Sequence, residues 1–170
     1  MAKADKIQLL SKEKTIQKIK RIAYEIFERN FDEKEVIIAG IGGEGYRFAQ
    51  LLVDELKQIS TFEVVIAKVS FDKMAVSQPE ILIESEVDTF RNKAVVLVDD
   101  VLNTGKTLAF SLRPFLSIQL KKLQLAVLVD RNHQMYPMAA DYVGYSLSTT
   151  LSEHVQVTLS NEEEFGVYLF

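Results

Sequence analysis

Two acidic residues and a turn rich in hydroxyl side chains follow directly after an apolar stretch of the sequence. The apolar stretch covers residues 94–98, the acidic residues are Asp99 and Asp100, and the turn reads Thr-Gly-Lys-Thr over residues 104–107. Backbone N–H groups at a helix start, with threonine hydroxyls beside them, can bind a phosphate group. Carboxylates suit vicinal hydroxyls and, directly or through water, a hard cation such as Mg²⁺. The segment therefore predicts a site for a sugar phosphate.

Two other interpretations fit parts of this segment. A Walker A loop also contains Gly-Lys-Thr, but it needs a glycine five positions before Gly105, where this chain has Asp100. A site for a nucleoside triphosphate of that kind is therefore excluded. The remaining alternative is that the acidic pair only caps a helix and that Thr-Gly forms an ordinary turn. The order of strand, acidic pair, turn and helix favours the phosphate site.

The elements around this segment alternate between strand and helix patterns. Apolar, β-branched runs predict buried strands, and apolar residues at three- and four-residue spacing predict helices. Such alternation indicates an α/β fold with a parallel sheet, which binds ligands at the carboxyl ends of its strands, here just after residues 41, 98 and 129. The predicted strands are 36–41, 64–69, 94–98 and 125–129, and the predicted helices are 11–30, about 45–59 and about 105–117.

Two regions depart from this alternation. Residues 70–92 are polar and mixed, so they predict a loop or hairpin with one short strand at 81–83. In the tail, residues 142–144 and 155–159 predict short strands that cap or edge the sheet rather than extend its parallel core. The aromatic residues near the C-terminus are expected to pack against the domain or a subunit partner.

Composition sets limits on the class of protein. The 170 residues suit a single domain over 1–170, with a net charge of −4 and no cysteine. Thiol catalysis, iron–sulfur clusters and zinc ribbons are excluded, so any metal must bind through oxygen. No apolar stretch approaches the roughly 20 residues of a membrane helix, and the first residues have no apolar core followed by a small-residue cleavage site, so a cytoplasmic location is expected. The mild acidity argues against broad nucleic-acid binding.

The strand, acidic pair and Thr-Gly-x-Thr turn resemble the phosphoribosyl pyrophosphate signature of the type I phosphoribosyltransferases. More narrowly, residues 21–30, 124–131 and 140–144, with His133 and Pro137, resemble the bifunctional pyrimidine operon regulator and uracil phosphoribosyltransferase family, PyrR. The resemblance spans most of the chain. It implies an α/β fold with a mostly parallel sheet flanked by helices, a small hood and a flexible loop.

The same resemblance implies a reaction and a set of partners. Ribose 5-phosphate would pass from phosphoribosyl pyrophosphate to uracil, giving UMP and pyrophosphate, with Mg²⁺ as cofactor. A homo-oligomer, dimer or larger, is implied, and some members bind a pyrimidine-operon RNA leader. Asp99 and Asp100 would hold the ribose hydroxyls as the catalytic carboxylates. The full set predicted to bind phosphoribosyl pyrophosphate is Asp99, Asp100, Val101, Leu102, Asn103, Thr104, Gly105, Lys106 and Thr107.

The chain departs from the family pattern in the loop after the first strand. The family usually presents Thr-Arg-Gly there to hold pyrophosphate, whereas this chain reads Gly42, Gly43, Glu44 and Gly45. A carboxylate at 4 Å from a diphosphate charge would repel it by about 1 kcal/mol even in water. Arg47 or Lys68 is expected to compensate.

Two further departures concern the flexible loop and the hood. The loop is shortened to about residues 70–86 and contains Lys73 but no arginine, and basic hood positions of relatives are replaced by Gln134, Ala139, Tyr145 and Leu151. RNA binding is therefore expected to be weak or absent. Asp130, Arg131 and Lys73 are predicted to contact the base or pyrophosphate.

These departures leave three functions open. The first is a uracil phosphoribosyltransferase of low activity, and it is favoured because the Asp99–Thr107 signature is intact. The second is a regulator of little activity that senses phosphoribosyl pyrophosphate or nucleotides. The third is an RNA-binding attenuation protein.

Overall fold

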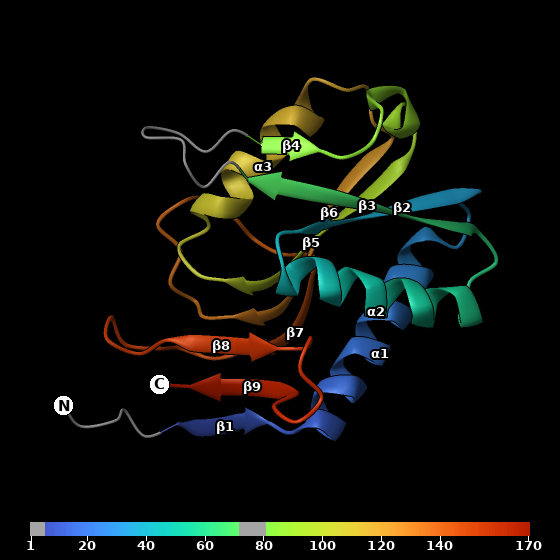
Figure 1. Ribbon diagram of the computed structural model, residues 1–170. Helices are drawn as coiled ribbons and strands as arrows, with labels where there is room; N and C mark the ends of the chain where they lie inside the picture. Colours follow the sequence, from blue (N-terminus) through green and yellow to red (C-terminus); the bar gives the residue numbers. More distant parts are fainter. Residues whose placement is uncertain (1–5, 72–80) are drawn as a thin grey trace.

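The computed structural model describes residues 6–71 and 81–170, and a six-stranded sheet lies at its centre (Figure 1). The strand order is β4-β3-β2-β5-β6-β7, and all neighbours are parallel except β4, which returns antiparallel to β3. The long β-branched runs form the inner strands because these are covered on both faces. The strands are β2 (Glu35–Ile41), β3 (Glu63–Phe71), β4 (Ile81–Ile83), β5 (Ala94–Leu102), β6 (Lys122–Asp130) and β7 (Tyr142–Ser146).

Helices cover both faces of this sheet. The helices α1 (Lys12–Asn30) and α2 (Glu44–Ile59) pack on one face, and α3 (Lys106–Leu116) packs on the other with the 3₁₀ turn η1 (Val87–Phe90) (Figure 1). Successive side chains of a strand point to opposite faces. Accordingly, Val36 and Ile38 of β2 belong to the core with α1 and α2, whereas Ile37 and Ala39 belong to the core with α3.

Three further strands form a small antiparallel sheet in the order β1-β9-β8 (Figure 1). They are β1 (Ile7–Leu10), β8 (Val155–Thr158) and β9 (Gly166–Leu169). Leu10, Val157 and Val167 are buried in the same core as α1 and α2. This small sheet, with the connection that enters it from β7, forms the hood expected from the resemblance.

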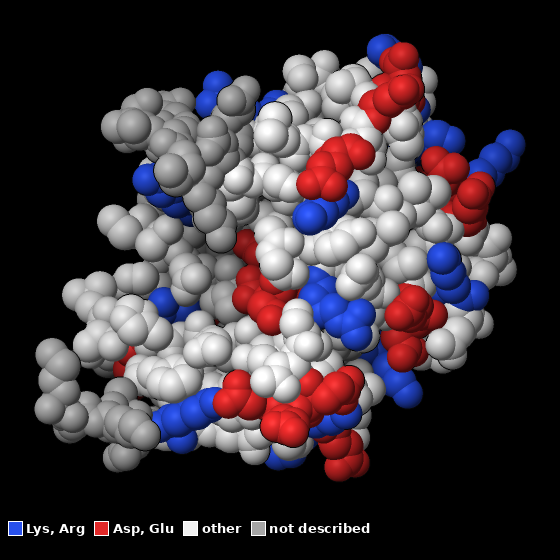
Figure 2. Space-filling view, in the orientation of Figure 1, with Lys and Arg blue, Asp and Glu red and all other residues white. Residues whose placement is uncertain are grey.

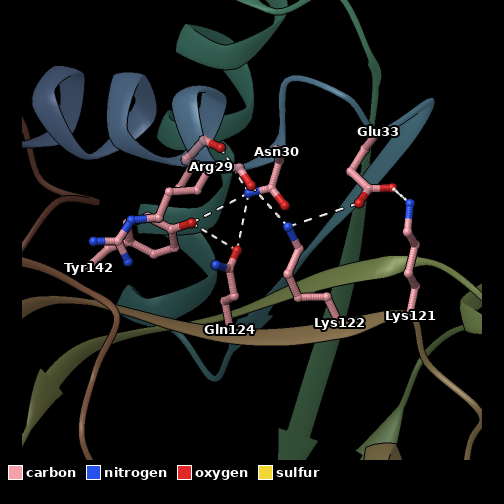
Figure 3. Close-up of polar contacts among 8 residues, drawn as sticks. Arg29, Asn30, Glu33, Lys121, Lys122, Gln124 and Tyr142 are labelled. Atoms are coloured by element: carbon pink, nitrogen blue, oxygen red, sulfur yellow. Dashed lines mark hydrogen bonds and ion pairs between the residues drawn. The ribbon is translucent and has the colours of Figure 1, made fainter.

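The C-terminal end of α1 is fastened to β6 and β7 by a buried polar network (Figure 3). The amide Nδ2 of Asn30 donates to the carbonyl of Ile26 at 2.8 Å and to Oε1 of Gln124 at 3.1 Å, and the hydroxyl of Tyr142 donates to the same Oε1 at 2.8 Å. Lys122 donates to the carbonyl of Arg29 at 2.9 Å. This network lies at the amino ends of β6 and β7, away from the ends where a parallel sheet binds ligands.

The predicted α/β architecture is confirmed, including the helix cap at Ser11, whose Oγ accepts the Lys14 N–H at 3.3 Å. The predicted hairpin is also present, since β4 pairs with β3. The predicted strand 94–98 is longer than expected: it continues as β5 to Leu102, because Asp99 and Val101 pair with Val127 and Val129 of β6. The segment 142–146 is an edge strand of the sheet, as expected, but β7 also runs parallel to its neighbour β6 and so extends the parallel ladder, which was not expected.

Charged side chains of both signs are interspersed on the surface drawn in Figure 2. Several form exposed ion pairs, such as Lys6 with Glu164 at 3.3 Å and Lys12 with Glu162. Exposed pairs contribute little to stability, typically about 0–1 kcal/mol. In the described part of the chain, no helix has the length and apolar character needed to cross a membrane.

Candidate functional site

A cavity of about 280 Å³ lies at the carboxyl ends of β2 and β5. One wall is the loop from Ile41 to Gly45 at the start of α2, and the other runs from Asp99 to Leu108 at the start of α3, with Phe71 at the end of β3. The two segments that the sequence singles out, 42–45 and 99–107, therefore meet in one cavity. Phe71 was not predicted to line it, although its place at a strand's carboxyl end is the signal that could have identified it.

Gly105 shapes the wall formed by the start of α3. Its φ of +83° lies in the left-handed region, which favours glycine, and a Cβ there would stand 3.1 Å from Cγ of Met138. The hydroxyl oxygen of Thr104 accepts the Lys106 N–H at 3.3 Å. The first turn of α3, whose backbone N–H groups have no partner within the helix, thus borders the cavity and can bind an anion.

The carbonyl of Thr104 holds the connection between β6 and β7 against this turn. It accepts N–H bonds from Met135 at 2.8 Å and from Tyr136 at 3.0 Å. The side chain of Tyr136 lies 3.5 Å from where a Gly105 Cβ would be. Met135 and Tyr136 therefore stabilise the turn at 104–107, although they do not line the cavity, and the sequence did not predict this contact.

The two neighbouring carboxylates of β5 differ in their surroundings. Asp99 is 7% exposed, and its Oδ1 accepts the N–H of Asp100 at 2.9 Å. A Cβ on Gly45 would lie only 2.7 Å from the same oxygen, so the start of α2 packs directly against Asp99. Burial, reinforced by the charge of Asp100, raises the pKa of Asp99 well above its usual value. Asp100 is half-buried, so it is the more accessible carboxylate of the pair.

Glu44 has a partner in the small sheet. Its Oε2 accepts the N–H of Leu159 at 2.8 Å, just after β8, and the side chain is half-buried at the first turn of α2. A carboxylate is favourable at a helix N-terminus because of the helix dipole. Glu44 therefore joins the hood to the loop where the family has a cation, a contact between residues 115 positions apart that no local pattern reveals.

Asp130 and Arg131 lie at the end of β6, and neither is among the described residues that line the cavity. Oδ1 of Asp130 accepts the N–H of Asn132 at 2.8 Å and Nε2 of Gln134 at 3.0 Å. Arg131 is only 7% exposed and donates four hydrogen bonds to oxygens of Asn103 and of residues 149–153. The structure therefore gives both side chains intramolecular partners, and their contact with base or pyrophosphate stays a prediction. Lys73 lies outside the described residues.

The side chains around the cavity determine how the predicted Mg²⁺ could be bound. Among residues 6–71 and 81–170, no group of three or more histidine or carboxylate side chains could hold a metal ion. Glu44, Asp99 and Asp100 nevertheless line the cavity, and Asp100 is the more accessible carboxylate of the acidic pair. Mg²⁺ keeps several waters and commonly binds one or two carboxylates together with substrate phosphates. The residues present fit an ion held mainly by a diphosphate substrate.

Known proteins resemble this chain over most of its length. Residues 7–161 match the phosphoribosyl transferase domain family. The bifunctional protein PyrR of Streptomyces coelicolor is 38% identical over 150 residues, which cover 84% of this chain and 78% of that protein. The bifunctional protein PyrR of Clostridium acetobutylicum is 33% identical over 173 residues, which cover 97% of each.

Solved structures resemble the fold. A hypoxanthine-guanine phosphoribosyltransferase from Bacillus anthracis aligns with a TM-score of 0.76 at 22% identity, covering 99% of this chain and 98% of that one. A hypoxanthine phosphoribosyltransferase from Trypanosoma cruzi aligns with a TM-score of 0.79 at 17% identity, covering 96% and 94%. At this identity the likeness concerns the fold, which is the type I phosphoribosyltransferase fold. The chain belongs to the phosphoribosyltransferase family and, within it, to the PyrR proteins.

Proposed function

We propose that this protein transfers ribose 5-phosphate from phosphoribosyl pyrophosphate to uracil and releases UMP and pyrophosphate. The observation that carries the proposal is the cavity that combines an anion-binding helix start with the half-buried carboxylate of Asp100. A sugar phosphate needs both groups, one for its phosphate and one for its hydroxyls. Membership of the PyrR proteins supports the pyrimidine as acceptor. The whole chain, 1–170, is proposed to act as one domain, because the hood shares the core of α1 and α2.

Each wall of the cavity has a proposed role. The first turn of α3 and the Thr104 hydroxyl hold the 5-phosphate, and Asp100 accepts hydrogen bonds from the ribose hydroxyls. The loop 42–45 lies beside the diphosphate. Mg²⁺, if held mainly by the substrate with Asp100 nearby, would supply positive charge to the leaving pyrophosphate. As the C1–O bond breaks, the ribosyl centre becomes positive, and the carboxylate of Asp100 stabilises it electrostatically.

Glu44 favours a second candidate function, a sensor of nucleotides with little turnover. Its carboxylate lines the cavity at the family's cation position, which disfavours diphosphate binding and is compatible with a protein that senses nucleotides with little turnover. An RNA attenuation role belongs to the same alternative. The cytoplasmic location and the homo-oligomer also stay predictions, to be checked by cell fractionation and light scattering.

The deciding experiment measures UMP formation from uracil and phosphoribosyl pyrophosphate, with and without Mg²⁺, beside calorimetry with UMP. Turnover supports the transferase, whereas tight UMP binding without turnover on any base supports the sensor. The variant Thr104→Val with Gly105→Ala should abolish UMP binding while the protein still unfolds cooperatively. Unchanged affinity in that variant would remove the turn before α3 from the site.

A further inference from the structure

The amide orientation of Asn103 is fixed by a buried guanidinium. Nη1 of Arg131 donates to Oδ1 of Asn103 at 2.8 Å. Arginine can only donate, so the atom of Asn103 that faces it must be the oxygen, because the amide nitrogen would set two donors against each other. The Nδ2 group of Asn103 is consequently the outward end of this amide.

Arg131 is itself held in one position from the opposite side. Its Nε donates to Oγ1 of Thr149 at 2.9 Å, and its Nη2 donates to the carbonyl of Glu153 at 2.7 Å and to that of Thr150 at 3.4 Å. The loop that supplies these oxygens is closed on itself, because the Glu153 carboxylate accepts the Thr150 N–H at 2.6 Å, a bond that lowers the pKa of Glu153. A 7% exposed Arg131 between fixed acceptors has little freedom to release Asn103.

Asn103 has an unpaired hydrogen-bond donor at the cavity wall. The residue is exposed and is one of those that line the cavity, and no hydrogen-bond acceptor pairs with its Nδ2 within the part of the chain that the structure describes. It is the one amide side chain among the described lining residues. The anionic groups of a sugar phosphate are matched by backbone N–H groups and Lys106, so a neutral N–H donor suits a neutral carbonyl oxygen. Its hydrogen bond to Arg131, which directly follows β6 and also binds residues 149–153, places Asn103 at the part of the cavity wall nearest to these segments.

We propose that Nδ2 of Asn103 donates a hydrogen bond to a carbonyl oxygen of the pyrimidine base and that Arg131 is the positioning residue for this donor. The inference rests on the proposed function and names the group that would favour an oxo-pyrimidine. In the reaction the N1–C1 bond forms, the C1–O bond breaks, pyrophosphate leaves with the electron pair, and the N1 proton passes to water. Negative charge that develops on the base spreads to its carbonyl oxygens, where a donor stabilises it.

The test compares uracil with 2-thiouracil and 4-thiouracil, whose sulfur atoms are weaker acceptors, in the wild type and in Asn103→Leu. We expect Asn103→Leu to lower kcat/KM for uracil about 10- to 100-fold, as loss of one transition-state hydrogen bond does. We also expect the preference for uracil over one of the two thio analogues to fall to about 1. A purely structural role would lower all three rates alike and leave that preference unchanged, which would overturn the inference.

Three further variants sharpen the test. Asn103→Asp keeps an acceptor for Arg131 but loses the donor, so kcat/KM for uracil should fall as it does in Asn103→Leu, and a rate within about twofold of wild type would show that only the link to Arg131 matters. Arg131→Lys should reduce the oxo preference while the KM for phosphoribosyl pyrophosphate changes less than about threefold. The control is Gln58→Leu, an exposed amide at the C-terminal end of α2, which should change nothing.

Binding measurements with UMP and its thio analogues distinguish a wrong inference about Asn103 from a wrong proposed function. If the wild type shows no turnover with uracil, the proposed transferase fails. The inference is then decided by calorimetry with UMP, 2-thio-UMP and 4-thio-UMP, where the wild type must prefer UMP over one analogue and Asn103→Leu must not. If turnover is present but neither preference changes in Asn103→Leu, the transferase stands and the inference is wrong.

Discussion

Two adjacent aspartates on one strand have different roles because one side chain faces the packed start of α2 and the other is half-buried in the cavity wall. For Asp99, burial is the main reason for a raised pKa, so the folded protein binds a proton at this carboxyl more tightly than the unfolded chain does. Folding stability from this group is therefore full below the unfolded pKa of about 4 and is lost as the pH rises through the folded value.

This difference predicts the effect of Asp99→Asn, which keeps an acceptor for the Asp100 N–H but cannot ionise. Its free energy of unfolding should exceed that of the wild type at pH 8, by about 1.4 kcal/mol for each unit by which the pKa is raised, and the excess should disappear toward pH 4. Urea unfolding across this range measures it. Asp100→Asn is the control, with a smaller gain because it leaves burial, the largest cause of the raised pKa of Asp99, in place. A gain in Asp99→Asn that does not vary with pH would contradict the explanation.

Glu44 carries a second prediction, because its charge and its hydrogen bond can be separated. Glu44→Gln keeps an acceptor for the Leu159 N–H and removes the charge, so affinity for phosphoribosyl pyrophosphate should rise about fivefold with stability unchanged. Glu44→Arg should also raise turnover with uracil if the charge is the main handicap. It should nevertheless cost about 1–3 kcal/mol of stability, because it leaves the N–H of Leu159, a 1% exposed residue, without this acceptor.

Calorimetry with phosphoribosyl pyrophosphate and urea unfolding of both Glu44 variants give the two quantities. Unchanged affinity in both variants would show that the Glu44 charge does not weaken binding of phosphoribosyl pyrophosphate.

At the scale of single residues, the sequence predicts the features that are local: the acidic pair and the turn at 104–107 follow one strand and meet in the cavity. It cannot predict the bond of Glu44 to Leu159 or of Arg131 to Asn103, because these depend on how distant segments pack.

The elements were predictable where the pattern of apolar residues is strong. The inner strands and α1 and α2 follow from continuous or periodic apolar runs, whereas β1 and β9 are four residues each and pair with each other across the whole chain. A short strand of this kind has little pattern of its own, and it is stabilised by its pairing partner. The extension of β5 to Leu102 was missed for a related reason, since Asp99 and Asp100 look like turn residues until β6 is beside them.

The close approach of α2 to β5 gives a prediction for Gly45→Ala. The added Cβ would lie 2.7 Å from Oδ1 and 3.1 Å from Cα of Asp99, so α2 must move away from the strand that carries the acidic pair. We expect a loss of about 1–3 kcal/mol in stability, despite the higher helix propensity of alanine, and weaker binding of phosphoribosyl pyrophosphate.

The matched control is Gly43→Ala, where the added Cβ meets no atom within 4 Å and φ is −81°. Its free energy of unfolding should stay within about 0.5 kcal/mol of the wild type. Urea unfolding compares the two variants. Equal stability of Gly45→Ala and Gly43→Ala would show that α2 is not held as closely to β5 as the structure indicates.

At the scale of the whole molecule, two kinds of contact join the hood to the central sheet: a shared apolar core and side-chain hydrogen bonds. Apolar residues of β1, β8 and β9 share the core of α1 and α2, and Glu44 and Arg131 connect hood segments to the two walls of the cavity. A change in the hood is therefore expected to reach the cavity through these hydrogen bonds. The outer surface of the hood carries exposed Gln134, Ala139 and Leu151, where the resemblance to the PyrR family implies basic residues.

The surface predicts weak binding to a pyrimidine-operon RNA leader. The net charge is −4, the face in Figure 2 shows basic side chains among acidic ones, and Gln134, Ala139 and Leu151 are exposed at hood positions where the resemblance implies cations. Each missing phosphate contact removes part of the counterion-release term that drives RNA binding. Filter binding near physiological salt should give a dissociation constant of about 1 μM or weaker.

Restoring the charges tests the cause. The triple variant Gln134→Lys, Ala139→Lys and Leu151→Lys should bind the leader more tightly than the wild type. Its affinity should also depend more steeply on salt, with the slope of log K against log salt more negative by about 0.7 per restored contact on single-stranded RNA. Because these side chains are exposed, the free energy of unfolding should stay within about 0.5 kcal/mol of the wild type. Nanomolar, sequence-selective binding by the wild type would contradict the prediction and favour the attenuation role, since the protein would then recognise RNA without a basic hood.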